Sequence, residues 1–234
     1  MPSIVPIATF RSPVSGKFGL PRQSSLAKHL RGRIVFEPDF KDPSALSGLE
    51  GFDRIWLIWG FSENASDGTF HPTVRPPRLG GNERVGVWAS RSPFRPNGLG
   101  LSAVRVAAIR LSSPDGLVIE VLGADLADGT PIYDIKPYVA YSDSFPDSAS
   151  GFAPEAPEAA LKVVYRAPSP LSQEDTAALT ELLSLDPRPA YHDDPTRIYG
   201  LTFNSHDIHF RVNGNILEVI DFTAARGPAE GGFR

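Results

Sequence analysis

The 234-residue chain contains no cysteine. It therefore forms no disulfide, cysteine zinc site or iron–sulfur cluster, and it has no thiolate nucleophile. It also lacks the run of about 18 apolar residues that a membrane-spanning helix needs. Its first residues, MPSIVPIATFRSP, do not pair a basic segment with an apolar one, as a secretory signal does. These absences predict a cytoplasmic protein that does not enter a membrane.

Several signatures of catalysis and cofactor binding are missing as well. No G-x-G-x-x-G follows an apparent strand, no Walker loop is present, and no G-x-S-x-G elbow occurs. A Rossmann dinucleotide site, ATP use and a hydrolase of the nucleophile-elbow type are therefore not supported. His206 and His209 are three apart in a segment with strand character, so they face opposite sides and do not easily share a metal. We expect no metal site.

Long helices are also scarce in the sequence pattern. The 21 glycines and 23 prolines follow no period, which favours short elements joined by turns over helical bundles. The segment 83–90 alternates apolar with other residues, as a half-buried strand does. Because few helices separate the strands, we predict a mainly β fold with a barrel-like domain over residues 1–141. The segments with strand character are 2–10, 32–38, 52–61, 83–90, 101–111, 116–125 and 130–141.

A second, smaller unit follows. Residues 142–159 are rich in Ser, Pro, Ala and acidic residues and predict a linker. Residues 160–234 then predict a small α+β domain. Its expected elements are a strand at 161–166, a helix at 169–187 capped by Ser169 or Ser172, and a hairpin at 197–224 turning at Asn213-Gly214.

The charge is unevenly placed along the chain. The net charge is −4, which argues against a general nucleic-acid binder. However, residues 1–36 carry six basic residues and no acid, and residues 71–105 carry six arginines against Glu83 alone. The guanidinium group is a permanently charged, planar fork for phosphates and carboxylates. This clustering favours a local anion site over a merely solvated basic face.

Three segments rich in Gly, Pro and polar residues predict binding loops. They are FGLPRQSS (18–25), RSPFRPNG (91–98) and DGTPIYDIKPY (128–138). Proline stiffens such loops, so they lose less entropy on binding. Gln23 offers both a donor and an acceptor, which suits a purine edge or an amino-acid head group. One loop of this kind is ordinary turn chemistry, but three in one barrel-like domain indicate a composite pocket.

These segments also carry a resemblance. FGLPRQ, PTVRPPRLGGNERVGVWASRSPFRPNGLGLS and LADGTPIYDIKPY, in this order and spacing, resemble the TrmO family, also called TsaA-like or YaeB-like. The resemblance covers residues 4–141 and continues in DPRPAY (186–191). It implies a single-sheeted β-barrel that binds S-adenosylmethionine, and a homodimer with the cofactor near the subunit interface. It also implies methylation of N6 of N6-threonylcarbamoyladenosine at position 37 of tRNA, beside the anticodon and in the anticodon loop.

The motif match also implies which residues of this chain bind the cofactor. Where the family often has a His-Gln pair this chain has Ser62-Glu63, and where RPNP-I-G is usual it has RPNGLG, with Gly98. The resemblance implies no particular catalytic residue. The implied cofactor residues are Pro21, Arg22, Gln23, Ser62, Glu63, Arg91, Leu101, Asp128, Gly129, Thr130 and Pro131.

The substrate implied by the resemblance bears a threonyl carboxylate and phosphates, for which arginine is the natural partner. Trp88 and Phe94 have rings that can stack on a base, but core packing is the favoured interpretation for both. The candidates for substrate contact are Arg75, Arg78 and Arg95, followed by Lys136 and Tyr191.

Two other functions stay open at this point. The Ser62-Glu63 and Gly98 departures are compatible with a noncatalytic barrel that binds RNA or a nucleotide. They are equally compatible with a methyltransferase that acts on another small substrate. Transfer of label from S-adenosylmethionine to tRNA separates the three hypotheses.

Overall fold

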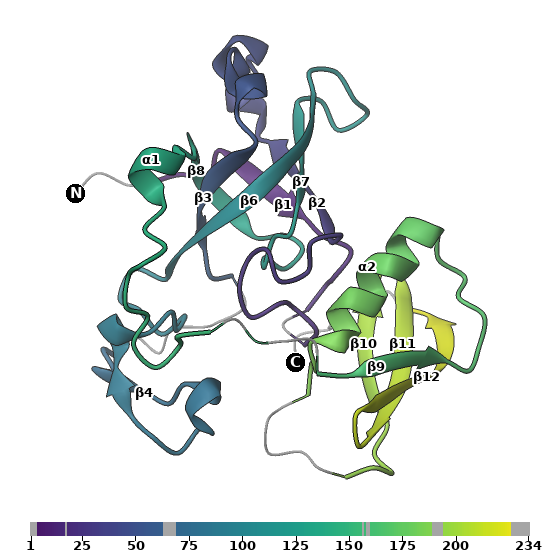
Figure 1. The fold of residues 1–234 in the computed structure, drawn as a ribbon. Helices are drawn as coiled ribbons and strands as arrows, with labels where there is room; N and C mark the ends of the chain where they lie inside the picture. The colour runs from purple at the N-terminus through teal and green to yellow at the C-terminus, as the bar shows by residue number, and fades with distance from the viewer. Residues whose placement is uncertain are drawn as a thin grey trace, which may run out of the picture.

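The structure, a computed structural model, describes residues 4–16, 18–62, 69–155, 157, 160–188 and 194–225. Six strands close into an antiparallel barrel in the order β1-β2-β7-β6-β3-β8 (Figure 1). The prediction of a mainly β fold with an N-terminal barrel is confirmed. The barrel strands are β1 (Ala8–Arg11), β2 (Arg31–Phe36), β3 (Arg54–Gly60), β6 (Leu99–Arg110), β7 (Val118–Leu122) and β8 (Pro131–Pro137).

Alternating apolar residues fill the barrel. In β3 the side chains of Ile55, Leu57 and Trp59 are buried, although the sequence reads as one continuous apolar run. The indole of Trp59 leaves no room for a side chain on the residue opposite it in β6. That residue is Gly100, and a Cβ there would lie 2.3 Å from the indole ring. Glycine at this position is therefore what admits the tryptophan to the barrel interior.

An arm projects from the barrel between β3 and β6 (Figure 1). It holds β4 (Thr73–Val74), η4 (Pro77–Leu79), β5 (Val85–Gly86) and η5 (Val87–Ala89). The prediction of a strand over 83–90 is wrong, since only two of these residues pair and the next three form a 3₁₀ turn. The opposing segment contains Pro72, Pro76 and Pro77, which have no amide hydrogen for a longer ladder.

Short helical turns lie at the end of the barrel opposite the arm. They are η1 (Pro38–Phe40), η2 (Pro43–Leu46), η3 (Leu49–Gly51) and α1 (Ala140–Asp143). Asp42 caps η2 as the sequence suggests, with its carboxylate accepting a hydrogen bond from the Ser44 amide at 2.9 Å. Asp143 accepts from the Trp56 indole at 2.9 Å, which ties α1 to β3.

The C-terminal unit is a four-stranded sheet with one helix. Helix α2 (Gln173–Ser184) buries its predicted apolar stripe against the sheet, and Ser172 caps it. The predicted single hairpin is wrong by one strand, because Asn204 and Ser205 form an extra turn with φ of 46° and 62°. The strands lie in the order β10 (Tyr199–Phe203), β11 (His206–Asn213), β12 (Ile216–Ala224) and β9 (Lys162–Tyr165).

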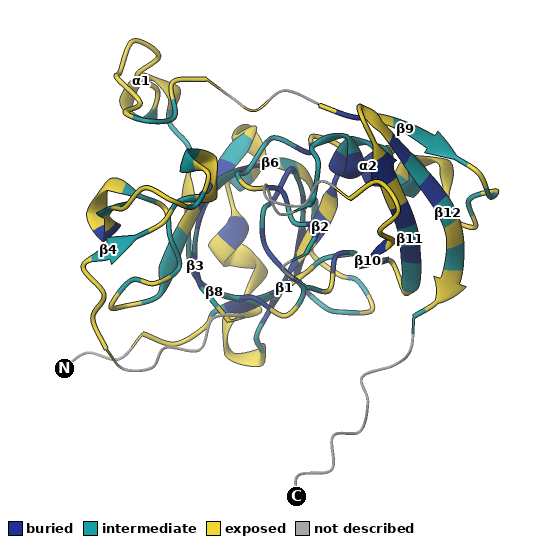
Figure 2. Ribbon diagram, turned by 90° about the horizontal axis from the view of Figure 1, so that it is seen from below, coloured by how far each residue is buried: buried dark blue, intermediate teal, exposed yellow. Residues whose placement is uncertain are grey.

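The long loop between β1 and β2 belongs to both units. Val14, Ala27 and Leu30 are buried in the same apolar cluster as α2 and strands β10 to β12. Val14 also forms a β-bridge with Phe203. Figure 2 shows buried residues both inside the barrel and along the sheet beneath α2. Within the described residues, no helix has the length and apolar character to cross a membrane.

Candidate functional site

All three predicted loops leave the same end of the barrel. Each strand runs antiparallel to its barrel neighbours, so the β1–β2, β3–β6 and β7–β8 connections share one end, and β2–β3 and β6–β7 share the other. The first connection contains residues 18–25, the second 91–98, and the third 123–130. The third predicted loop, 128–138, is a loop only at its start, because Pro131–Pro137 form β8. Topology therefore brings together the first two predicted loops and the beginning of the third.

Hydrogen bonds join these loops directly. The Ser25 amide donates to the Gly123 carbonyl at 2.7 Å, and the Arg91 guanidinium donates to the Gln23 side-chain oxygen. Gly123 has φ of +76°, and a Cβ there would lie 3.2 Å from Ser25 Cα. Gly123 thus permits both the turn after β7 and the close approach of the first loop.

A buried carboxylate that sequence analysis missed lies at this junction. Asp125 Oδ1 accepts a hydrogen bond from Ser102 Oγ at 2.6 Å, and Ser102 Oγ accepts one from Trp59 Nε1 at 3.0 Å. Burial raises the pKa of Asp125, against the opposing effects of Ser102, the positive charge of Arg91 and the Ser24 amide. The expected strand over 116–125 placed Asp125 in a ladder, whereas β7 ends at Leu122.

The 128–131 turn closes the base of the first loop. The Asp128 side chain accepts from the Ser12 amide at 3.0 Å and lies 3.7 Å from Arg11. Gly129 has φ of +78°, is exposed, and has open space where a side chain would be. Thr130 is buried and donates to the Ala127 carbonyl at 2.8 Å, and Pro131 begins β8.

Some of the remaining cofactor candidates lie around this junction. Pro21 is buried and Arg22 exposed, and both line a cavity of about 190 Å³ between the first loop and the end of α2. Leu101, next to Ser102, keeps 58% of its surface exposed on β6. Ser62 is exposed beside Phe61, whose amide donates to the Gly98 carbonyl at 2.9 Å. Glu63 lies outside the described residues.

The substrate candidates are more dispersed. Arg95 donates to the Ser90 carbonyl at 2.7 Å and stacks over Trp88 at 5.4 Å. Arg75 and Arg78 lie on the arm, where Arg78 donates to the Glu155 carbonyl. Lys136 pairs with Asp134 near the end of β8 opposite the 128–131 turn. Tyr191 lies outside the described residues.

The aromatic residues of the arm do not pack into a core. Trp88 is 66% exposed and Phe94 is 55% exposed, so the core-packing interpretation is wrong. Trp88 instead stacks on Phe70, itself 52% exposed, with ring centroids 5.9 Å apart. Exposed aromatic surface of this extent is typical of a binding face.

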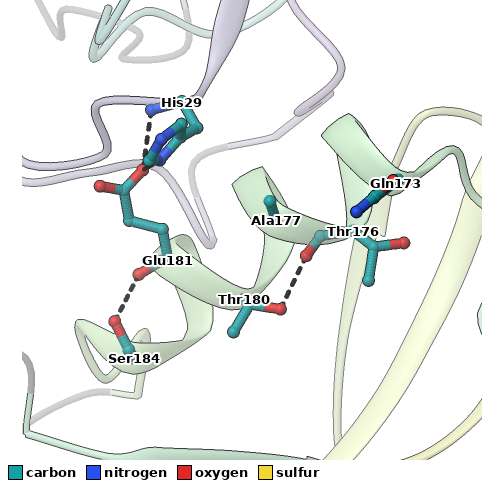
Figure 3. A pocket seen from close by; sticks show the side chains of 7 residues that line it. All are labelled: His29, Gln173, Thr176, Ala177, Thr180, Glu181 and Ser184. Carbon is teal, nitrogen blue, oxygen red and sulfur yellow. Dashed lines mark hydrogen bonds and ion pairs between the residues drawn. The ribbon is translucent and has the colours of Figure 1, made fainter.

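A larger hollow lies on the outer face of α2, away from these loops. Figure 3 shows its lining, in which His29 Nδ1 lies 3.2 Å from Glu181 Oε2. The hollow is about 580 Å³ and open to solvent, but its lining holds no arginine or Gly-Pro turn. It therefore lacks the chemistry of an anionic or adenosyl ligand. Among the described residues, no cluster of His, Asp and Glu fits a metal ion either.

Comparison with known proteins decides the family. The family described as "tRNA-methyltransferase O N-terminal domain" matches residues 9–144, and "TrmO C-terminal domain" matches residues 154–225. The chain belongs to the TrmO family. The TrmO resemblance found in the motifs is thereby confirmed.

Two relatives and a solved structure of the TrmO family align over almost the whole chain. The tRNA (adenine(37)-N6)-methyltransferase of Escherichia coli (strain K12) is 36% identical, covering 91% of this chain and 94% of that protein. A putative S-adenosylmethionine-dependent methyltransferase of Pseudomonas aeruginosa, RcsF, is 37% identical over 94% and 96%. The crystal structure of TrmO from Pseudomonas aeruginosa matches with a TM-score of 0.76 and 28% identity, covering 96% and 99%.

Proposed function

We propose that the protein is an S-adenosylmethionine-dependent enzyme that methylates N6 of N6-threonylcarbamoyladenosine at position 37 of tRNA in the cytoplasm. The observation that carries the proposal is the convergence of the three motif loops, joined by Arg91, Gln23 and Gly123, at one end of the barrel. The names of the relatives support a methyltransferase acting on tRNA and using this cofactor.

The residues at the junction fit the chemistry of the cofactor. Arg91 can hold the carboxylate of its methionyl part with a charge-assisted hydrogen bond. Gln23 can pair with the edge of the adenine through its amide. The exposed side chain of Leu101 offers apolar surface to the adenosyl group, and Gly129 leaves the 128–131 turn open to it. The carboxylate, the adenine edge and the apolar surface of the ligand thus each have a partner of suitable polarity among the implied cofactor residues.

The protein contributes mainly position. When bound, S-adenosylmethionine supplies a methyl group on a sulfonium, which departs as a neutral thioether once the methyl has moved to N6. The loops would hold the N6 lone pair, methyl carbon and sulfur in line, and such alignment is worth up to about 7–11 kcal/mol in favourable cases. N6 carries an acyl group, so its N–H is acidic. Its proton would pass to solvent water, and arginines close to N6 would favour the anion that forms. Arg75, Arg78 and Arg95 offer charge for the threonyl carboxylate and the phosphates.

Position 37 is reached most easily in the single-stranded anticodon loop. An unstacked base costs little to present there, and a duplex would hide N6 from the loops. We therefore assign the tRNA partner to its anticodon loop.

We also propose a homodimer. On the arm, Phe70 and Trp88 form an exposed stacked pair and Phe94 exposes another ring, and Leu101 exposes a further apolar side chain on β6. A second copy that covered these side chains would bury them and enclose the cofactor at the same time.

The proposed function is tested by methyl transfer. The protein is incubated with radiolabelled S-adenosylmethionine and tRNA from cells with or without threonylcarbamoyl modification. Label only in the modified tRNA supports the proposal. Cofactor binding with no transfer, or transfer to a small metabolite and to neither tRNA pool, contradicts it.

A further inference from the structure

A chain of hydrogen bonds runs from the barrel interior to the loops. Trp59 of β3 donates to Ser102 of β6 at 3.0 Å, and Ser102 donates to Asp125 at 2.6 Å. Trp59 and Ser102 are buried, with 8% and 2% of their surfaces exposed. The Asp125 carboxyl is thereby fixed to the rigid wall of the barrel.

That one carboxyl group acts on all three loops. Asp125 itself lies in the β7–β8 connection, it accepts a hydrogen bond from the Ser24 amide of the first loop, and it faces the positive charge of Arg91 in the β3–β6 connection. Arg91 in turn donates to Gln23. Asp128, by contrast, contacts Ser12 and Arg11.

Burial of an ionisable group is costly unless it is paired. Asp125 lies in the β7–β8 connection and not in the barrel core, so its carboxylate acts on the loop groups around it. Pre-ordered loops bind more tightly because less entropy is lost when the ligand arrives.

We propose that Asp125 is a positioning residue of the cofactor site, which anchors the first loop and Arg91 to the barrel wall before the cofactor binds. The inference rests on the proposed function in that Arg91 and Gln23 are taken to hold S-adenosylmethionine. Asp125 acts through these residues, and Ser102 fixes the direction of its carboxylate.

The test compares Asp125→Asn, Ser102→Ala and the double variant with wild type, and uses Asp115→Asn as a matched control. Asp115 is a carboxylate paired with Arg33 in the β6–β7 turn, at the opposite end of the barrel. Hydrogen exchange of residues 20–26 is measured without cofactor, and S-adenosylmethionine affinity is measured by calorimetry. KM and kcat for methyl transfer are measured on the same proteins.

In Asp125→Asn we expect exchange of residues 20–26 to be at least about 10-fold faster. The Kd and KM for S-adenosylmethionine should rise about 10- to 100-fold, the range of a lost hydrogen bond to a charged group, with kcat nearly unchanged. Ser102→Ala should shift the same quantities less, and the double variant should match Asp125→Asn, because Ser102 acts through Asp125. Asp115→Asn should behave as wild type.

Two results would overturn the inference. One is wild-type exchange of residues 20–26 in both Asp125→Asn and Ser102→Ala. The other is a lower Tm in these variants with unchanged cofactor affinity, which a merely structural role predicts. If wild type binds no S-adenosylmethionine, the proposed function fails, while the exchange measurement still decides whether Asp125 holds the loop. If Asp125→Asn does not fold, the exchange and affinity measurements on Ser102→Ala decide whether this hydrogen-bond chain positions the first loop.

Discussion

Arg91 and Asp125 form the electrostatic centre of the candidate site. The guanidinium donates to the Gln23 side chain and its charge acts on Asp125, and Arg91 is exposed, so it can also meet an anion. Arg91 could be singled out from the sequence because it sits in a proline-braced, arginine-rich loop. Asp125 could not, since its role arises from Ser102 and Ser24, which are distant in sequence and carry no motif of their own.

Replacing Arg91 with Ala should weaken S-adenosylmethionine binding about 10- to 100-fold, because a charge-assisted hydrogen bond to the ligand carboxylate is lost. Calorimetry checks the affinity. Arg105→Ala, an exposed arginine farther along β6, is the control and should bind as wild type does. Equal affinity of the Arg91 variant and wild type would remove Arg91 from the site.

Asp125 should also shape the pH dependence of stability. Its pKa is raised in the folded state, chiefly by burial, so its contribution to stability is fully present below the unfolded-state pKa. That contribution is lost as the pH rises through the folded-state pKa. The unfolding free energy of wild type relative to Asp125→Asn should therefore fall as the pH rises above about 4, the unfolded-state pKa of an aspartate. Denaturant titrations across this range measure it, and a difference that grows with pH would contradict the raised pKa.

The strands and loops show what a sequence pattern can and cannot reveal. Most barrel strands were predicted to within a few residues because alternating or continuous β-branched and aromatic runs are bounded by Gly and Pro. The exception is the strand expected at 2–10, which begins only at Ala8. The strand expected at 83–90 failed because pattern alone does not show that the facing segment lacks amides. The extra turn at Asn204-Ser205 was hidden inside a segment that otherwise has strand character throughout.

Gly123 joins the first loop to the end of β7, and Gly123→Ala should expose its role. Alanine would have to adopt the left-handed φ of +76° at this position, and its Cβ would lie 3.2 Å from Ser25 Cα. We expect a loss of unfolding free energy of about 1–3 kcal/mol together with weaker cofactor binding. Gly214→Ala, with φ of +58° and open space around it, is the control for φ strain alone. Wild-type cofactor affinity in Gly123→Ala would show that the Ser25 contact does not position the loop.

The two units of the chain are less separate than their sequence suggests. Composition marks a linker at 142–159, but the first loop inserts Val14, Ala27 and Leu30 into the apolar cluster of the C-terminal unit. Sequence patterns did not reveal this because a loop residue's burial depends on a partner about 190 residues away, as the Val14–Phe203 bridge shows. The C-terminal unit therefore supports the loop that carries Gln23.

The exposed face of the arm makes a prediction about assembly. The double variant Phe70→Ala/Trp88→Ala should be monomeric, or its dimer should have a larger dissociation constant than that of wild type. The reason is that the stacked aromatic pair supplies the apolar centre of the proposed interface. Light scattering after size exclusion measures the mass. Tyr141→Ala removes an aromatic that is 92% exposed on α1 and should leave the dimer intact. A monomeric wild type would contradict the homodimer.

The location of the cofactor is tested most directly by a crystal structure of the protein with S-adenosylhomocysteine, the product of methyl transfer. Density for the ligand should lie among Gln23, Arg91, Leu101 and the 128–131 turn, with its carboxylate on Arg91. Density in the hollow between His29 and α2, or at another place outside the three loops, would contradict the account.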